Sequence, residues 1–318
     1  MEIYYDSIQE GIWFKGLSEN LEDSILLPFP PRNKCPDWLV DVLSLDRPDI
    51  VLVDKEQPIL VLERTTEVPS GHNVGQRFGR LVAAAIKQIP AIYFGPYMAY
   101  KHGGKTQGPR YMNLRLFYAL NEVAKIESTA ITTINWPVDK NCEIIQTANK
   151  DDRMRIYLDL FFRAYFYVEL REMCRILMDS DFEKGQQAER NEFKKTKVVD
   201  AAQYDSPPPS VIIASWELIQ ELSSWSPTNL IRGNVVFYNV GMKYIRSDPY
   251  AGSALLYSYL YCGGLRNRTK DFILYFPNIS IAMWSDASQK GGRKDIRMFK
   301  IVADGILFKD GYLPSSEL

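Results

Sequence analysis

Two short apolar runs dominate the hydrophobic pattern of the N-terminal part of the chain. Residues 50–53 and 59–62 are rich in Ile, Val and Leu, and the polar segment 54–58 separates them. Runs of this length joined by so short a turn predict the two strands of a hairpin. Each run carries one acid where a buried strand should carry none, with Asp49 opening the first and Glu63 near the end of the second.

The segments around this hairpin predict a mixed α/β fold. Residues 36–43 precede it with helical spacing, residues 73–88 follow it as a longer amphipathic helix, and residues 90–94 are a further buried strand. This order indicates a central mixed β-sheet flanked by helices. Further along, the pattern predicts helices over 110–126, 152–178, 183–197 and 252–262, and strands over 130–136, 235–240, 271–276 and 298–302.

A stiff connector, Ser206-Pro207-Pro208-Pro209-Ser210, suggests the domain organisation. We expect residues 1–205 to hold the core with the N-terminal elements and long helices, and residues 206–318 to form a C-terminal α+β extension. The two parts could also pack as one domain. The helix over 152–178 is apolar almost all round, so it lies either inside the monomer or at a dimer surface.

The two acids of the hairpin are candidate metal ligands. A hairpin brings the carboxylates of Asp49 and Glu63 together, and they repel each other unless a cation lies between them. The strand period of two places Ile59, Val61, Glu63 and Thr65 on one face, and Glu67 joins them if the strand continues. The expected metal site is therefore Asp49 and Glu63, with Glu67 as a possible third ligand.

These residues resemble the signature of the PD-(D/E)XK nuclease superfamily, which includes many restriction endonucleases. Pro48-Asp49, thirteen residues, Glu63, one residue and Thr65 make up the resemblance, which extends over roughly residues 36–95. It implies a restriction-endonuclease-like core and a Mg²⁺-dependent endodeoxyribonuclease, with Mn²⁺ able to substitute. The implied activity is that of a type II restriction enzyme cutting double-stranded DNA, with a homodimer to cut both strands.

One position departs from the family pattern, since the family usually has Lys where this chain has Thr65. Lys87 on the following helix or Lys55 in the turn could supply the charge instead, and the sequence does not choose between them. On the same helix, Gln76 and Arg80 are spaced four apart and share a face, with Arg77 on the adjoining stripe. Arginine binds phosphate oxygens in pairs, so this face could hold the scissile phosphate; a solvated polar face is the alternative. The expected catalytic set is Asp49, Glu63, Thr65, Gln76, Arg80 and Lys87.

Two basic, glycine-containing segments in the C-terminal third, 263–270 and 285–294, are candidate DNA-binding loops. Ordinary solvated loops are the alternative. Together with Arg77 on the helix, the residues expected to contact DNA are Arg266, Arg268, Lys290, Arg293 and Lys294.

Composition narrows the remaining choices. The chain has 318 residues, 46% of them hydrophobic, and a net charge of −1, which neither supports nor excludes a local basic surface. Four scattered cysteines and two histidines make a structural zinc site improbable. No signal peptide or membrane-length apolar run is evident, so we expect a cytoplasmic protein without a membrane partner. The rival functions are a non-catalytic DNA-binding module with a decayed nuclease core and, more weakly, a nucleotide-binding α/β protein, for which no glycine-rich loop follows a strand.

Overall fold

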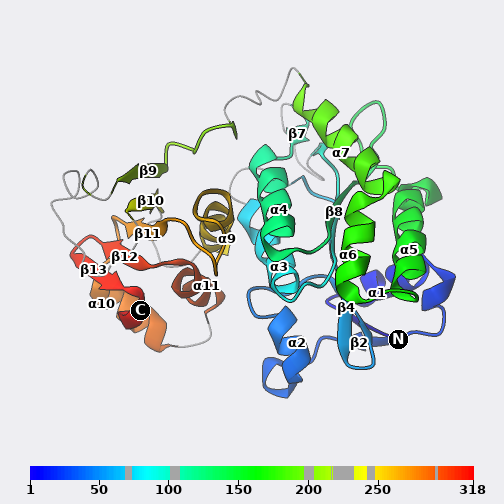
Figure 1. Ribbon diagram of the computed structural model, residues 1–318, viewed down its shortest axis with the longest axis horizontal. Coiled ribbons are helices and arrows are strands. Elements are labelled where there is room, and N and C mark those ends of the chain that lie inside the picture. Colours follow the sequence, from blue (N-terminus) through cyan, green and yellow to red (C-terminus); the bar gives the residue numbers. More distant parts are fainter. Residues whose placement is uncertain are drawn as a thin grey trace. The chain divides into compact units, whose positions relative to one another are not determined.

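The computed structural model describes residues 1–68, 74–100, 108–196, 204–215, 217, 233–241, 248–290 and 293–318. The chain divides into two compact units (Figure 1). Unit 1 comprises Met1–Gly71, Arg80–Asn113 and Val123–Val199, and unit 2 comprises His72–Gly79, Leu114–Glu122 and Asp200–Leu318. The longest segment of unit 2 begins at Asp200, and the unit also includes the first parts of two earlier helices.

Unit 1 contains a six-stranded mixed sheet of order β2-β1-β3-β4-β5-β8. β3 and β4 form the antiparallel hairpin, while β5 and β8 continue the sheet in parallel with β4. β1 pairs antiparallel with β3 and parallel with β2. The predicted hairpin and the mixed sheet flanked by helices are therefore confirmed. The strands are β1 (Glu2–Tyr5), β2 (Ile25–Pro28), β3 (Ile50–Asp54), β4 (Gln57–Arg64), β5 (Ala91–Gly95) and β8 (Ile131–Asn135).

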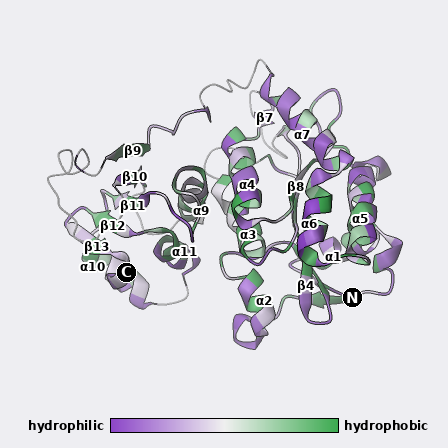
Figure 2. Cartoon of the chain, viewed as in Figure 1, coloured by the Kyte–Doolittle hydropathy of each residue, from purple (hydrophilic) through white to green (hydrophobic). Residues whose placement is uncertain are grey.

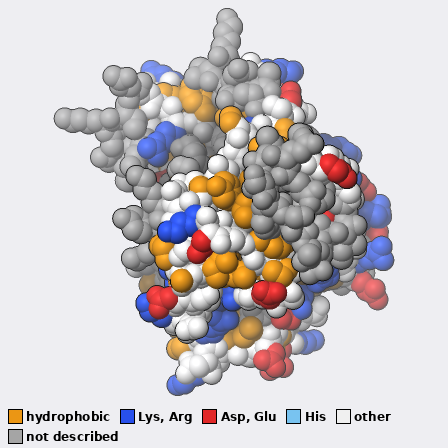
Figure 3. Space-filling model, turned by 90° about the vertical axis from the view of Figure 1, so that its left-hand side faces the viewer, with side chains coloured by type: hydrophobic (Ala, Val, Ile, Leu, Met, Phe, Trp, Pro, Cys, Tyr) orange, Lys and Arg blue, Asp and Glu red, His pale blue; other side chains and the backbone are white. Residues whose placement is uncertain are grey.

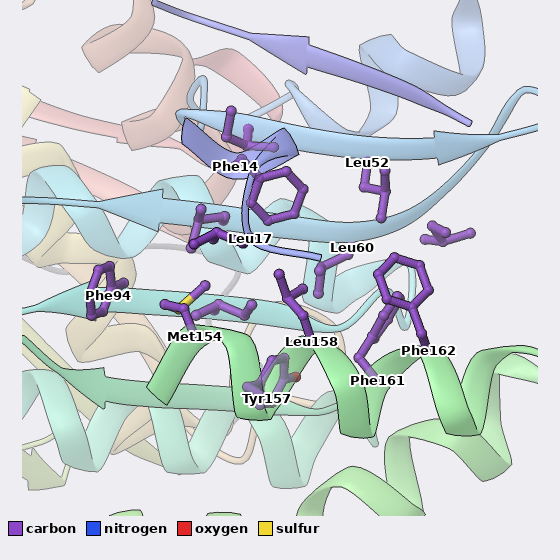
Figure 4. Close-up of a cluster of buried hydrophobic side chains, with 14 of the residues drawn as sticks. Phe14, Leu17, Leu52, Leu60, Phe94, Met154, Tyr157, Leu158, Phe161 and Phe162 are labelled. Atoms are coloured by element: carbon purple, nitrogen blue, oxygen red, sulfur yellow. The ribbon is translucent and has the colours of Figure 1, made fainter. Parts of the chain in front are cut away.

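Helices cover the sheet of unit 1. Its main core joins one sheet face to α1 (Ile8–Lys15), α5 (Asp152–Tyr165) and α6 (Leu170–Asp179), with Phe14, Leu60 and Phe161 among the side chains that meet there (Figure 4). α3 (Val74–Ile86) links β4 to β5, and the contact of Arg80 with Glu63 places this helix on the opposite face. The remaining helices are α2 (Asp37–Val42), α4 (Leu114–Glu127) and α7 (Asp181–Lys194).

The predicted alternation along β4 is wrong at one position. A register shift between Leu52 and Val53 leaves Ile59 as an extra residue on β4, opposite no partner. Ile59 consequently joins the same core cluster as Leu60 and Leu62, instead of sharing a face with Glu63. β-bulges of this kind commonly re-aim side chains near a site.

The single helix predicted over 152–178 is also wrong, because residues 166–169 separate α5 from α6. Both helices are amphipathic, carrying hydrophobic and hydrophilic positions in Figure 2. Met154, Leu158 and Phe161 are fully buried, while Tyr167 in the connection is 85% exposed. Most of the apolar surface of this segment is thus accounted for by burial within unit 1. α7 is less exposed than its charged sequence suggests, because Arg190 is buried against β8.

Unit 2 has a five-stranded sheet of order β13-β12-β11-β10-β9, parallel in its centre and antiparallel at both edges. The strand predicted over 298–302 is wrong, since these residues belong to α11. Hydrophobic side chains remain at the surface of this unit, as on the face drawn in Figure 3, and they include Ile212 and Met283. The elements are β9 (Val211–Ser215), β10 (Asn234–Asn239), α9 (Asp248–Tyr257), β11 (Asp271–Phe276), α10 (Ile281–Gln289), α11 (Lys294–Val302), β12 (Gly305–Phe308) and β13 (Gly311–Pro314).

Among the described residues, every helix is too short or too polar to cross a lipid bilayer.

Candidate active site

Asp49 and Glu63 converge on one nitrogen atom of Arg80. Nη1 of Arg80 donates to Oδ1 of Asp49 at 3.2 Å, and to Oε1 and Oε2 of Glu63 at 3.0 and 2.9 Å. The strand register explains this approach, because Ile50 pairs with Leu62 and the next residues of the hairpin are Asp49 and Glu63. The structure therefore brings together the two acids that the sequence indicates, and it adds the predicted Arg80 to them.

This cluster is buried and strongly charged. The side chain of Glu63 is 0% exposed, and that of Asp49 is 10% exposed. Burial opposes the charge of Arg80, but Glu63, Asp46 and Asp49 outweigh it and raise the pKa of the guanidinium above its ordinary value. Nε of Arg80 also lies 3.6 Å from Oδ2 of Asp46, an acid that the sequence analysis did not single out. Three acids thus surround one guanidinium.

Asp49 is additionally fixed from the backbone. Its Oδ2 accepts a hydrogen bond of 2.6 Å from the N–H of Arg64, so each carboxylate oxygen has its own donor. A hydrogen bond to an ionised carboxylate is stronger than one between neutral groups and favours the charged form. The position of Asp49 is thereby set by β4 itself.

The side chain of Arg64 lies on the other face of β4 from Glu63, against aromatic rings. Its Cζ lies 4.3 Å from the ring centroid of Trp13 on α1 and 4.9 Å from that of Trp136, which follows β8. Phe94 stacks on both tryptophans, with interplanar angles of 2° and 5°. Burial lowers the pKa of Arg64, while the charges of Glu10, Asp151 and Asp49 oppose this shift.

Glu10 on α1 is a second residue that the sequence analysis missed. Burial, followed by the charge of Asp49, raises the pKa of Glu10 from 4.5 to about 7, against the opposing effect of Arg64 and Arg80. No motif connects position 10 with the hairpin in the sequence. The side chain of Arg64 was not assigned a role from the sequence either, although it is the one cationic residue of 59–67 and directly follows Glu63.

Thr65 and Glu67 form a local turn after β4. The hydroxyl of Thr65 accepts from the backbone N–H of Glu67 at 3.0 Å and donates to the carbonyl of the same residue at 3.1 Å. Glu67 is exposed. Within the part of the chain that the structure describes, no three acid, histidine or cysteine side chains form a metal-binding group, so Glu67 does not complete one with Asp49 and Glu63.

Neither alternative lysine reaches the acids. Nζ of Lys87 lies 2.5 Å from Oδ2 of Asp41 on α2, and Lys87 follows Arg80 by two helical turns, or roughly 10 Å along the axis. Lys55 is in the turn with a positive φ of 50°, at the far end of the hairpin from Asp49. The shifted-lysine hypothesis therefore finds no support in this geometry.

Arg77 is half-buried on α3, and the side chain of Gln76 lies outside the described residues.

The C-terminal cations differ from one another in their surroundings. Arg268 is corrected from a DNA contact to an interior residue, because its side chain is 5% exposed and donates to Asp304 at 2.8 Å. Lys290 pairs with Asp286 one helical turn away, and Arg293 pairs with Asp295 two residues further along the chain. Arg266 is exposed, and Lys294 is half-buried at the start of α11.

The donor set suits Mg²⁺, which takes oxygen ligands and is usually held by one or two carboxylates with water or phosphate in the other positions. Asp49 and Glu63 supply two hard carboxylate ligands that already point at one place, where Nη1 of Arg80 now lies. A metal ion there would have to replace that nitrogen. The chain matches no protein-family model, no curated protein and no solved structure.

Proposed function

We propose that this protein is a Mg²⁺-dependent endodeoxyribonuclease with a restriction-endonuclease-like core, of the type that cuts double-stranded DNA at a specific sequence. The observation that carries the proposal is the convergence of Asp49 and Glu63 on one cation, within 3.2 Å of its nitrogen. It combines with the spacing of these acids in the sequence and with their place at the open end of an antiparallel hairpin.

Each group of this cluster has a distinct part in the proposed reaction. Asp49 and Glu63 would hold the metal, which when bound would lower the pKa of a water molecule and neutralise charge on the phosphate oxygens. The oxygen of a water molecule forms a bond to phosphorus while the bond from phosphorus to the 3′ oxygen breaks. The 3′ oxygen takes up a proton, and the products are 5′-phosphate and 3′-hydroxyl ends.

Arg80 fits a double role in this scheme. In the absence of a metal its guanidinium neutralises Glu63, whose side chain is fully buried and would otherwise carry an uncompensated charge. Once displaced from the acids, its planar fork can bind a phosphate oxygen pair. A duplex has two strands to cut, so we further propose that a homodimer supplies two such sites.

A non-catalytic DNA-binding module is the second candidate, and two observations favour it. Thr65 stands where the family has lysine and uses its hydroxyl within a local turn. Arg80 already satisfies both acids without a metal. Such a module would bind duplex DNA and leave it intact.

Incubation of the purified protein with plasmid DNA of mixed sequence, in Mg²⁺ and then in chelator, separates the two. Discrete fragments that need Mg²⁺ support the restriction-type enzyme, a smear indicates a nonspecific nuclease, and intact DNA supports the module.

Asp49→Asn and Glu63→Gln remove a charge at nearly constant shape, and each should abolish cleavage while DNA binding persists. Asp159→Asn removes a charge from the exposed side of α5 and is the matched control. Full cleavage by either site variant at saturating Mg²⁺ would remove that acid from the site.

A further inference from the structure

Arg64 differs from the other arginines that pack against the sheet of unit 1 near the site in how its guanidinium is satisfied. Arg80, Arg153 and Arg190 each hydrogen-bond a carboxylate. Among the described residues, the guanidinium of Arg64 donates no hydrogen bond. Its Nε is buried without a partner, as are the Nε atoms of Arg80 and Arg190, but those two arginines bond carboxylates through their terminal nitrogens. A buried donor left unpaired is expensive, which indicates that this group is shaped for an acceptor from outside the chain.

The aromatic contacts of Arg64 hold it in place without using its hydrogen-bond donors. Trp13 and Trp136 face its Cζ at 4.3 and 4.9 Å, and cation–π contact uses the flat side of the guanidinium. The N–H groups along its edge stay available for oxygen atoms. Trp13 is itself fixed, because its Nε1 donates to Asp151 at 2.9 Å.

The location of Arg64 connects it with the proposed metal ligands. Its backbone N–H binds Oδ2 of Asp49, and its side chain lies within the electrostatic influence of Asp49 and Glu10. The backbone of Arg64 and the side chain of Arg80 therefore both bind Asp49, while the side chain of Arg64 lies on the other face of β4 from Glu63. A phosphodiester beside Asp49 carries one negative charge and would need positive charge to offset its repulsion with the acids, and Arg80 holds those acids until a metal displaces it.

We propose that Arg64 binds a phosphate group of DNA beside Asp49, where β3 begins and β4 ends, and supplies the positive charge that Thr65 does not. This inference rests on the proposed function for its catalytic consequence, but it concerns binding first. The planar guanidinium offers paired donors to phosphate oxygens, so Arg64 acts by hydrogen bonding and transfers no proton. The ligand class is a phosphodiester, with Arg64 as a direct contact to substrate.

Duplex binding and cleavage of Arg64 variants test this inference. We would compare wild type with Arg64→Gln and Arg64→Lys, and with Arg163→Gln, which removes the same charge from the exposed side of α5. Arg64→Gln should slow single-turnover cleavage in Mg²⁺ on the order of 10²-fold to 10³-fold. In chelator, its slope of log affinity against log salt should fall by about one unit. Arg64→Lys should keep the salt slope and cleave at an intermediate rate, and Arg163→Gln should match wild type in both assays.

The outcomes separate this inference from the proposed function. If Arg64→Gln binds and cuts as wild type does while Asp49→Asn is inactive, the Arg64 inference is overturned and the nuclease proposal stands. If the wild-type protein binds duplex without cutting it, and Arg64→Gln loses one unit of salt slope, the nuclease proposal fails and the phosphate contact stands. Failure of the wild-type protein to bind DNA at all overturns both. If thermal denaturation shows that Arg64→Gln is unfolded, the comparison of Arg64→Lys with wild type decides. A cleavage rate of Arg64→Lys equal to that of wild type would then overturn the inference, because lysine cannot offer paired donors.

Discussion

Arg80 and Glu63 form a bidentate contact, with one guanidinium nitrogen 2.9 and 3.0 Å from the two oxygens of a fully buried carboxylate. The same nitrogen is 3.2 Å from Asp49, so the side chain of Arg80 contacts both of the acids that would hold a metal ion. In the proposed function, Arg80 and a divalent cation would therefore compete for one carboxylate pair. This competition leads to a stability prediction that does not depend on catalysis.

Arg80→Ala should destabilise the protein in chelator by about 3–5 kcal/mol, because it leaves buried carboxylates without a counter-charge. Mg²⁺ should then restore more stability to the variant than to wild type, since a ligand that binds only the folded state raises the free energy of unfolding. Urea denaturation with chelator and with Mg²⁺ measures both effects. Arg163→Ala is the control, because its exposed ion pair should contribute under 1 kcal/mol and respond equally to either condition. A variant whose stability is indifferent to Mg²⁺ would argue against a metal between Asp49 and Glu63.

Thr65→Val and Lys87→Ala should leave the single-turnover cleavage rate within a factor of a few of wild type. Thr65 uses its hydroxyl on the backbone of Glu67, and Lys87 pairs with Asp41, so neither is aimed at the acids. Thr65→Val should instead lower the free energy of unfolding by about 1 kcal/mol through loss of its turn contacts. Glu63→Gln is the positive control, because loss of this proposed metal ligand should abolish cleavage. A large loss of rate in Lys87→Ala would revive the shifted-lysine hypothesis.

The sequence predicts the hairpin and its acids well because both depend on local information. Strand period, turn length and the place of Asp49 and Glu63 in apolar runs all lie within about twenty residues of chain. The aromatic contacts of Arg64 could not be predicted in this way, because Trp13 and Trp136 are far apart in the sequence. The hydrogen bond that fixes Trp13 also joins residues 138 positions apart.

The errors in secondary structure also have physical causes. Residues 152–178 are apolar on so many sides that their composition hides the break after Tyr165. Residues 298–302 contain the short apolar sequence of a strand, yet Phe299 and Val302 are buried with helical spacing next to Asp295 and Ile296. In both segments the local sequence is compatible with more than one secondary structure, and tertiary packing decides which one forms.

Glu10→Gln should change how stability depends on pH. The pKa of Glu10 is raised to about 7 in the folded protein, chiefly by burial and then by Asp49, so the folded state favours the protonated carboxyl. The stability that this preference contributes is fully present below pH 4.5 and is lost as pH rises towards 7. The glutamine variant lacks this titration and should gain stability relative to wild type between pH 4.5 and 7. Denaturant midpoints of both proteins across that range measure the difference, and a constant difference would exclude a perturbed Glu10.

Arg266→Ala and Arg268→Ala should separate DNA contact from structural support in unit 2. Arg268 donates to Asp304 at 2.8 Å and to the carbonyl of Gly264 at 3.2 Å, and Asp304 also accepts from the backbone N–H of Phe272. Arg268→Ala should lower the free energy of unfolding by roughly 2–3 kcal/mol, as expected for loss of a hydrogen-bonded charge pair with one nearly buried partner.

Arg266 is exposed, so Arg266→Ala should leave stability unchanged. If this loop follows a phosphate backbone, the variant should weaken binding to all duplexes and reduce the salt slope by about one unit. A contact to a guanine edge would instead cost roughly 1–3 kcal/mol on one target sequence alone. Thermal unfolding together with binding across a salt series measures both properties. Lys290→Ala is tested alongside as a second candidate DNA contact, and its exposed ion pair with Asp286 should contribute little to stability. Wild-type binding by both Arg266→Ala and Lys290→Ala at every salt concentration would place DNA recognition outside these segments, with the charged face of α7 the next surface to test.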